Sequence, residues 1–274
     1  MNTTPFPYPV QTGDLQRWLI KSALLLLGMA ILILAIGQYT DLDLVLADLY
    51  FDTQTKVFPW DSTWFARGLM HGWVKNVIVW SGYLLIVAML LDTVRPFARL
   101  DRTGRAKLRV VALASIIEPA LIVTLKGYSN MHCPWGIKRY GGPHPFLRLL
   151  DTVPDAWQAG HCFPAGHASV GMWLCALAVF WLPHSPHRAS TVFASGLFAG
   201  ITLGWVQQMR GQHFLTHTLW TAWLSSAVVI ALIAVFARQL EKRGAVTAPR
   251  FLDRSLAPPT KALIKRIGGQ ESAA

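Results

Sequence analysis

Long apolar runs alternate with polar segments along the chain and predict six membrane-spanning helices. A helix of about 20 mostly apolar residues is long enough to cross the hydrocarbon core of a bilayer. The predicted spans are residues 22–40, 73–91, 110–125, 168–183, 189–209 and 214–237. We therefore expect an all-α, polytopic membrane protein with no separate soluble domain.

The charged residues between these runs predict the direction in which each span crosses. Basic residues gather just before the first span, in the segment 92–109 and in the tail 239–274, whereas the segment 41–71 carries several Asp residues. Because short loops rich in Lys and Arg stay on the cytoplasmic side, both termini are expected there. The expected organisation is an N-terminal tail (1–16), a six-span membrane domain (17–238) and the basic cytoplasmic tail.

The composition supports a membrane protein and argues against other classes. The 274 residues are 53% hydrophobic and only 14% charged, which is too apolar for an ordinary soluble domain. The net charge of +11 comes from residues that flank apolar runs, so we expect the lipid bilayer as a partner and no nucleic acid. The first run lacks a convincing small-residue cleavage site and is expected to remain as an uncleaved anchor.

Polar residues of catalytic type gather at the ends of three predicted spans. Lys126 follows the third span, His167 precedes the fourth, and Arg210, His213 and His217 lie between the fifth and the sixth. The alternation of spans places all three clusters on the outer side of the membrane. We therefore expect these five side chains to converge on one site.

The second cluster stands at the start of a predicted helix and reads Pro164-Ala165-Gly166-His167. Backbone N–H groups in the first turn of a helix have no intrahelical acceptor, and the helix dipole is positive there. Gly166 removes the Cβ barrier to close approach of a ligand. This junction is therefore expected to bind an anion, with His167 as a proton carrier beside it.

The chemistry that this set of residues supports is phosphoryl transfer. Lys and Arg side chains hold a multiply charged oxyanion, and Arg does so through a two-pronged fork. One His can attack phosphorus as a nucleophile, while another protonates the leaving alkoxide. Such a site requires no metal and no other cofactor.

The three clusters resemble the signature of the type 2 phosphatidic acid phosphatase family, the integral-membrane lipid phosphate phosphatases. That family carries K-x6-R-P, P-S-G-H and S-R-x5-H-x3-D on a six-span helical fold. The first motif is similar from Lys126 to Pro134, with Cys133 in place of Arg, and the second is similar with Ala165 in place of Ser. The third aligns His213 with the nucleophile and His217 with the Asp that orients it.

The resemblance implies a role for each matching residue. His213 would form a phosphohistidine, His167 would protonate the leaving group and His217 would orient His213, while Lys126 and Gly166 would bind phosphate. Both family arginines are displaced, because Cys133 and Gln207 occupy their positions. We expect the guanidinium of Arg210 to replace one of them and the side chain of Lys138 or Arg139 to replace the other.

Two cysteines adjoin the motifs and leave several interpretations open. Cys133 and Cys162 each follow a His, and an oxidising compartment on the outer side favours a disulfide that ties the first motif to the second. Free thiols, or a zinc site that recruits His132 and His161, remain alternatives. The i,i+4 spacing of His213 and His217 also suits a metal or a haem.

Taken together, these observations predict a metal-independent lipid phosphatase at the periplasmic face of a bacterial inner membrane. Phosphatidic acid, phosphatidylglycerol phosphate, undecaprenyl diphosphate and a lipid A phosphate are candidate substrates. A lipid phosphotransferase with the same residues is an alternative, as are a non-catalytic binder or transporter of lipid phosphate and a membrane metal or haem protein.

Overall fold

The computed structural model describes residues 13–154 and 156–241. Most of the predicted N-terminal tail and of the basic tail 239–274 lies outside the described residues. The described part is helical, and its only β pairings are two isolated bridges, Asp52 with Val57 and Ile137 with His144. The predicted all-α class is therefore confirmed.

Five described helices are long and apolar enough to cross a membrane. They are α1 (Asp14–Tyr39), the continuous helix of η2 (Trp64–Val74) and α3 (Lys75–Val94), α4 (Arg102–Gly127), α6 (Pro186–Met209) and α7 (Leu215–Val235). The run predicted as the fourth span forms α5 (Gly166–Met172) and η5 (Trp173–Trp181), which together are shorter than the other five. A sixth crossing stays a prediction.

Short helices occupy the connections. They are α2 (Leu42–Asp48), η1 (Pro59–Ser62), η3 (Pro134–Gly136), η4 (Lys138–Tyr140) and α8 (Ala237–Glu241).

The second long helix begins earlier than its apolar run predicted. It starts at Trp64 rather than at residue 73, and its first section, η2, is π-helical. The hydroxyl of Thr63 accepts a hydrogen bond from the Ala66 N–H and caps this start. Arg67 and His71 interrupt the apolar pattern here, which is why the sequence assigned this stretch to the outer segment 41–71 and not to the span. Their position on a helix places both side chains near the candidate site described below.

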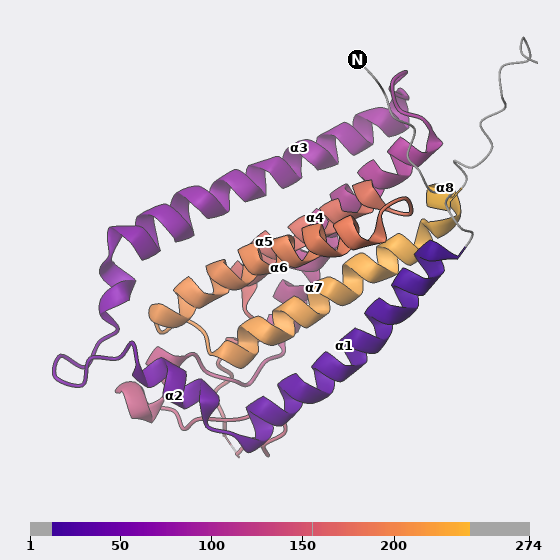
Figure 1. The fold of residues 1–274 in the computed structure, drawn as a ribbon. Coiled ribbons are helices and arrows are strands. Elements are labelled where there is room, and N and C mark those ends of the chain that lie inside the picture. Colours follow the sequence, from indigo (N-terminus) through magenta and orange to yellow (C-terminus); the bar gives the residue numbers. More distant parts are fainter. Residues whose placement is uncertain (1–12, 155, 242–274) are drawn as a thin grey trace, which may run out of the picture. The chain divides into compact units, whose positions relative to one another are not determined.

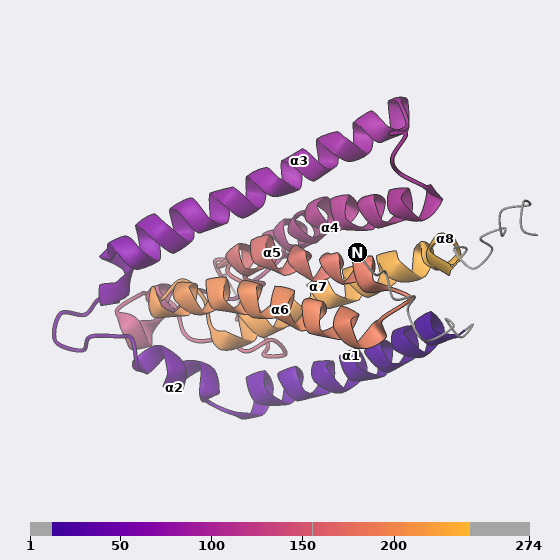
Figure 2. The ribbon, with the colours of Figure 1, turned by 45° about the horizontal axis from the view of Figure 1, so that its top comes forward.

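Helix α7 is at the centre of the bundle. It packs against α1, α4, α5 and α6, whereas α3 packs mainly on α4. Figures 1 and 2 show α1 and α3 on opposite sides of the bundle, with the other long helices between them. Because its neighbours surround α7, the ends of these helices meet near the N-terminal end of α7.

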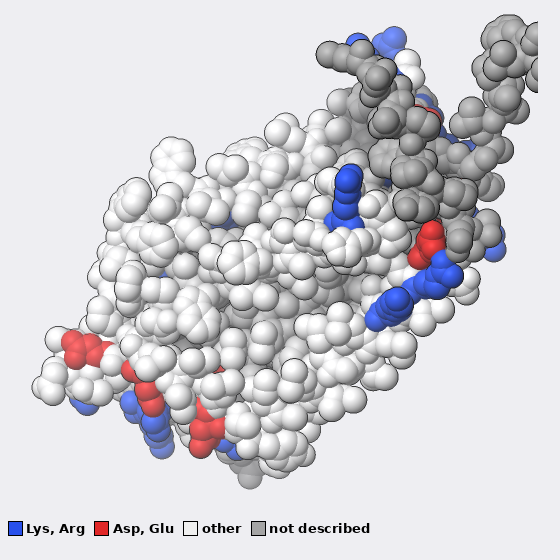
Figure 3. Space-filling view, in the orientation of Figure 1, with Lys and Arg blue, Asp and Glu red and all other residues white. Residues whose placement is uncertain are grey.

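The connections gather at the two ends of the bundle. Residues 40–63, 128–154, 156–165 and 210–214 lie at one end, and residues 95–101 and 182–185 lie at the other (Figure 1). Figure 3 shows charged residues mostly near these ends, with a broad band almost free of them between. The band suits lipid contact, and the grouping of connections agrees with the alternation predicted from the apolar runs.

A stripe of glycines allows α6 to pack closely on its neighbours. A Cβ at Gly196 would lie 2.4 Å from the backbone nitrogen of Cys175, and one at Gly204 would lie 2.3 Å from the Thr218 side chain. Small residues at such spacing let membrane helices approach until their backbones touch. The close approach fixes the position of the α6–α7 turn, which carries part of the candidate site.

The start of α7 is held by a carboxylate from α2. The Asp43 side chain accepts hydrogen bonds from the backbone N–H of Thr216 (2.9 Å) and from the Thr216 hydroxyl. Asp43 is buried, and burial raises the pKa of its carboxyl group. The contact joins the segment after α1 to the helix turn that carries His217.

We expect Asp43→Ala to destabilise the fold by about 1–3 kcal/mol, because it leaves buried donors without an acceptor. Thermal unfolding of the detergent-purified protein would measure the change. Thr216→Val removes only the hydroxyl partner, so the double variant should lose less stability than the two single losses added together. Strictly additive losses would contradict the proposed coupling between these two side chains.

Candidate active site

A polar cavity of about 260 Å³ opens at the end of the bundle that holds the N-terminus of α7. Histidines and cations dominate its wall, and they come from helices far apart in the sequence. The lining residues are Asp61, Arg67, His71, Lys126, Cys133, His167, Gln207, Arg210, Gln212 and His213. The structure therefore brings together four of the five side chains that the sequence predicted to converge, Lys126, His167, Arg210 and His213, whereas His217 does not line this cavity.

The α5 start holds His167 at the cavity through bonds to α7. The Ala165 N–H donates to the hydroxyl of Thr221 at 2.9 Å and to the carbonyl of His217 at 3.3 Å. Ala165 is fully buried, so its small side chain fits between the two helices. A Cβ added to Gly166 would meet no heavy atom within 4 Å, which leaves open space beside the first turn of α5.

A tight turn between α6 and α7 presents Arg210 and His213. Gly211 adopts φ of +67°, a left-handed conformation that glycine tolerates best. A Cβ at Gly211 would also lie only 2.4 Å from the ring of Phe58. The chain must therefore have glycine here, both for its backbone angle and for the packing of the turn.

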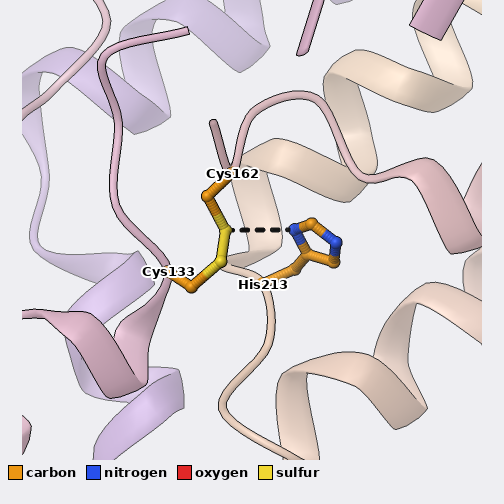
Figure 4. Close-up of side chains that lie close together, drawn as sticks. All are labelled: Cys133, Cys162 and His213. Carbon is orange, nitrogen blue, oxygen red and sulfur yellow. Dashed lines mark hydrogen bonds between the residues drawn. A yellow bond between two sulfur atoms is a disulfide. The ribbon is translucent and has the colours of Figure 1, made fainter. Parts of the chain in front are cut away.

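The His213 ring is buried beside a disulfide between Cys133 and Cys162 (Figure 4). Its Nδ1 atom lies 3.5 Å from the Sγ of Cys162, and its Nε2 atom points away from the sulfur. A disulfide sulfur can accept a hydrogen bond but cannot donate one, so the contact favours a proton on Nδ1 and a lone pair on Nε2.

The electrostatic surroundings keep the His213 imidazole neutral. Burial, together with nearby His217 and Lys126, holds its pKa well below the usual range. Because the pKa is lowered, the unprotonated ring persists from neutral pH into acidic solution. A neutral ring with a free lone pair is the form that can attack phosphorus.

The disulfide links the segment after α4 to the segment before α5. Its Cα atoms are 5.3 Å apart, and 29 residues separate the two cysteines in sequence. Cys133 stands where the resembling motif has Arg, so this part of the cavity wall is neutral. The same bond thus joins two motif segments and forms the surface against which His213 rests.

His217 does not make the contact that the resemblance implied. The ring centroids of His213 and His217 are 5.8 Å apart, and neither ring nitrogen of His217 has a hydrogen-bond partner among the described residues. His217 is fully buried and packs edge-on against Phe163 and Phe214. In this geometry, the group next to Nδ1 of His213 is the disulfide, and His217 supports the site through packing.

Arg210 is buried and fully engaged by partners from two other helices. Its Nε donates to Asp61 at 2.9 Å, and its Nη1 donates to the Nδ1 of His71 at 3.1 Å and to the side-chain oxygen of Gln207 at 3.0 Å. Asp61 also pairs with Nη2 at 2.7 Å, so it balances the charge of the guanidinium. The partners orient Arg210 at the cavity wall.

His71 connects Arg210 to His167. A guanidinium can only donate, so Nδ1 of His71 must accept, which leaves the ring proton on Nε2. The rings of His71 and His167 lie with their centroids 4.3 Å apart. The orientation of His167 therefore depends on a residue of the second long helix.

Lys138 and Arg139 do not reach the cavity. The guanidinium of Arg139 donates to both carboxylate oxygens of Asp48, at 2.8 Å and 2.6 Å, and Lys138 is exposed outside the cavity lining. The Asp48 carboxylate thus holds Arg139 in a structural ion pair on α2. Neither side chain therefore supplies the second cation that the sequence analysis expected at the site.

The sequence analysis missed Asp61, Arg67 and His71 as site residues. All three lie in the stretch that the apolar pattern assigned to an outer loop. The available signal was a cluster of polar side chains just before an apolar run, together with the lack of an arginine in the first motif. Sequence spacing alone does not show that this cluster folds against Arg210.

A metal interpretation finds weaker support in the geometry. Within the described residues, the one group of three potential ligands is Cys133, Cys162 and His213, and its two sulfurs are bonded to each other. His132 instead stacks on His144, and its Nε2 faces the Gln158 carbonyl. The ligand set of the alternative zinc site is therefore not assembled in this arrangement.

Comparison with known proteins identifies one family. The model of the PAP2 superfamily matches residues 107–241, which contain His167, His213 and His217. No curated protein and no solved structure matches the chain significantly.

We expect Cys133→Ser/Cys162→Ser to lower both stability and turnover. A cross-link across this separation contributes about 3–4 kcal/mol in the chain-entropy model, and its loss also frees the surface behind His213. Thermal unfolding and phosphate release would be measured with and without reductant. Cys175 is buried and not disulfide-bonded, so Cys175→Ala should leave the sensitivity of the protein to reductant unchanged. Equal turnover in the oxidised and reduced wild-type protein would contradict the positioning role.

Proposed function

Because the chain belongs to the PAP2 superfamily, we propose that it is an integral-membrane lipid phosphate phosphatase that acts through a phosphohistidine. The observation that carries the proposal is the shared cavity: a buried neutral His213, the His167 ring and the cations Lys126 and Arg210 line one space. A cation cluster with two histidines is suited to a phosphate ester and to its displacement.

In the first step, Nε2 of His213 attacks phosphorus and forms the N–P bond while the P–O bond to the lipid breaks. His167 takes up a proton from solvent when the anionic phosphate binds beside it, and it gives that proton to the departing alkoxide. The cations stabilise negative charge on the phosphoryl oxygens as the bond changes occur. N–H groups in the first turn of α5, at Gly166 and His167, lack intrahelical acceptors and would bind the same oxygens.

In the second step, water attacks the phosphohistidine. His167, now neutral, takes a proton from the water as the new P–O bond forms and the N–P bond breaks. Inorganic phosphate leaves, and His213 returns to its neutral form. An alcohol on a second lipid that replaced water would make the same protein a phosphotransferase.

An apolar groove beside the cavity supports a lipid substrate. It has a volume of about 420 Å³, and Arg67 belongs to both spaces. The groove follows one helix face on which every fourth residue has a short side chain or none: Gly68, Gly72 and Asn76. Trp73 and Trp80 add apolar area to its wall. An amphiphile would place its phosphate in the cavity and the start of its hydrocarbon chain in this groove.

The membrane placement follows from the same proposal. The helix of α5 and η5 would complete six crossings, and the cavity would open at the outer, periplasmic face of a bacterial inner membrane. The acidic loop 41–63 near the cavity and the basic loop 95–101 at the opposite end support this orientation.

Phosphate release from a panel of lipid phosphates, measured in EDTA with detergent-purified protein, tests the function. We expect release by the wild-type protein and a loss of at least about a hundredfold for both His213→Ala and His167→Ala, because each removes a group that acts on the reacting atoms. Acid-labile, base-stable phosphate on the protein would be trapped during turnover only when His213 is present.

Three outcomes would contradict parts of this proposal. Abolition of release by EDTA would favour a metal-dependent reaction. Transfer of phosphate to a second lipid without release would identify a phosphotransferase. Binding of lipid phosphates with no turnover on any panel member would identify a binder or transporter.

Gly166→Ala offers a separate test of the anion site. A methyl group at this position meets open space, so the thermal unfolding of the variant should match that of the wild-type protein. The same methyl group would occupy the space where phosphate approaches the first turn of α5, and we expect kcat/KM to fall about tenfold or more, as for loss of one charge-assisted hydrogen bond. Unchanged kcat/KM would show that phosphate does not approach this turn.

A further inference from the structure

The cavity contains more positive charge than its single acid balances. Four charged residues line it: Asp61, Arg67, Lys126 and Arg210. Asp61 is paired with Arg210, which leaves Arg67 and Lys126 without a carboxylate partner among the described residues. The net charge of the lining is therefore +2, and two separate cations supply it.

Arg67 differs from Arg210, the other guanidinium of the cavity, in its freedom. Its side chain is exposed and has no hydrogen bond or ion pair within the described part of the chain. It lies on η2, four residues before His71, so the two side chains project from neighbouring turns of one helix. π-Helical turns often occur at functional sites, where they direct side chains that a regular helix would space differently.

Arg67 is a candidate for the guanidinium that the resembling motif has at the position of Cys133. The resembling motif has an arginine at Cys133, but here that part of the cavity wall is an uncharged disulfide. Arg139 is held by Asp48 outside the cavity. Among the described residues that line the cavity, Arg67 is the remaining guanidinium once Arg210 is assigned to Asp61, His71 and Gln207.

We propose that Arg67 of the second long helix is the second phosphate-binding guanidinium of this site, and that it recognises a dianionic phosphate at the junction of the polar cavity and the apolar groove. A phosphomonoester carries a charge of about −1.5 to −2 at neutral pH. Arg67 and Lys126 together match that charge, whereas Lys126 alone would leave about half of it uncompensated. The inference rests on the proposed function, because it assigns a ligand to the same cavity.

Direct binding of inorganic phosphate tests the assignment without turnover. Phosphate would be titrated into detergent-purified His213→Ala protein, where no phosphohistidine can form, and followed by its ³¹P resonance. Adding Arg67→Ala should weaken binding about ten- to a hundredfold, the range for loss of a charge-assisted hydrogen bond, and Arg67→Lys should restore part of it. Arg95→Ala, a variant of an exposed arginine at the far end of the same helix, should bind phosphate within about twofold of the His213→Ala protein.

The outcomes separate this inference from the function on which it rests. Phosphate binding that is insensitive to Arg67→Ala would overturn the role of Arg67 and leave the phosphatase proposal standing. Failure of the His213→Ala protein to bind phosphate at all would overturn both. A defect of Arg67→Ala that appears only with long-chain lipids, with normal phosphate binding, would assign the guanidinium to the bilayer surface and also overturn the inference.

Discussion

A buried guanidinium must be paired with groups that accept its hydrogen bonds, and the pairing of Arg210 positions the other elements of the site. Only 8% of its side chain is exposed, and its partners Asp61 and His71 come from η1 and η2, which precede it by more than 130 residues. The pairing holds η2 against the α6–α7 turn. His71 in turn contacts His167, so satisfying one buried charge also sets the position of the ring that is proposed to move protons.

The sequence predicted most of the architecture, because apolar runs report directly on lipid contact. The lengths of the apolar runs predict the all-α class, and their alternation predicts how the connections group at the two ends. The order of the motifs predicts the convergence of Lys126, His167, Arg210 and His213. The start of the second long helix was missed. Polar side chains inside a helix look like a loop until the partner that they face is known, and here that partner is far away in sequence.

The substituted motif positions show why residue roles are harder to predict than location. The sequence indicates that Cys133 replaces an arginine, but only the three-dimensional contacts reveal that a disulfide surface rests behind His213. Arg139 was a reasonable replacement by proximity in sequence. Its two hydrogen bonds to Asp48 hold it outside the cavity. The local sequence does not show whether the guanidinium pairs with Asp48 or turns toward the cavity.

The groove and the cavity meet at Arg67, which lies outside the segment that matches the PAP2 superfamily. His167, His213 and His217 lie inside that segment, whereas His71 lies before it. On the proposed function, His213 and His167, which act on phosphorus and on the leaving group, belong to the matched segment, while the groove that would receive the hydrocarbon chain is formed by residues 67–80 before it. Substitutions along 64–80 would then alter the surface offered to the hydrocarbon chain without touching the residues proposed to move protons and to form the phosphohistidine.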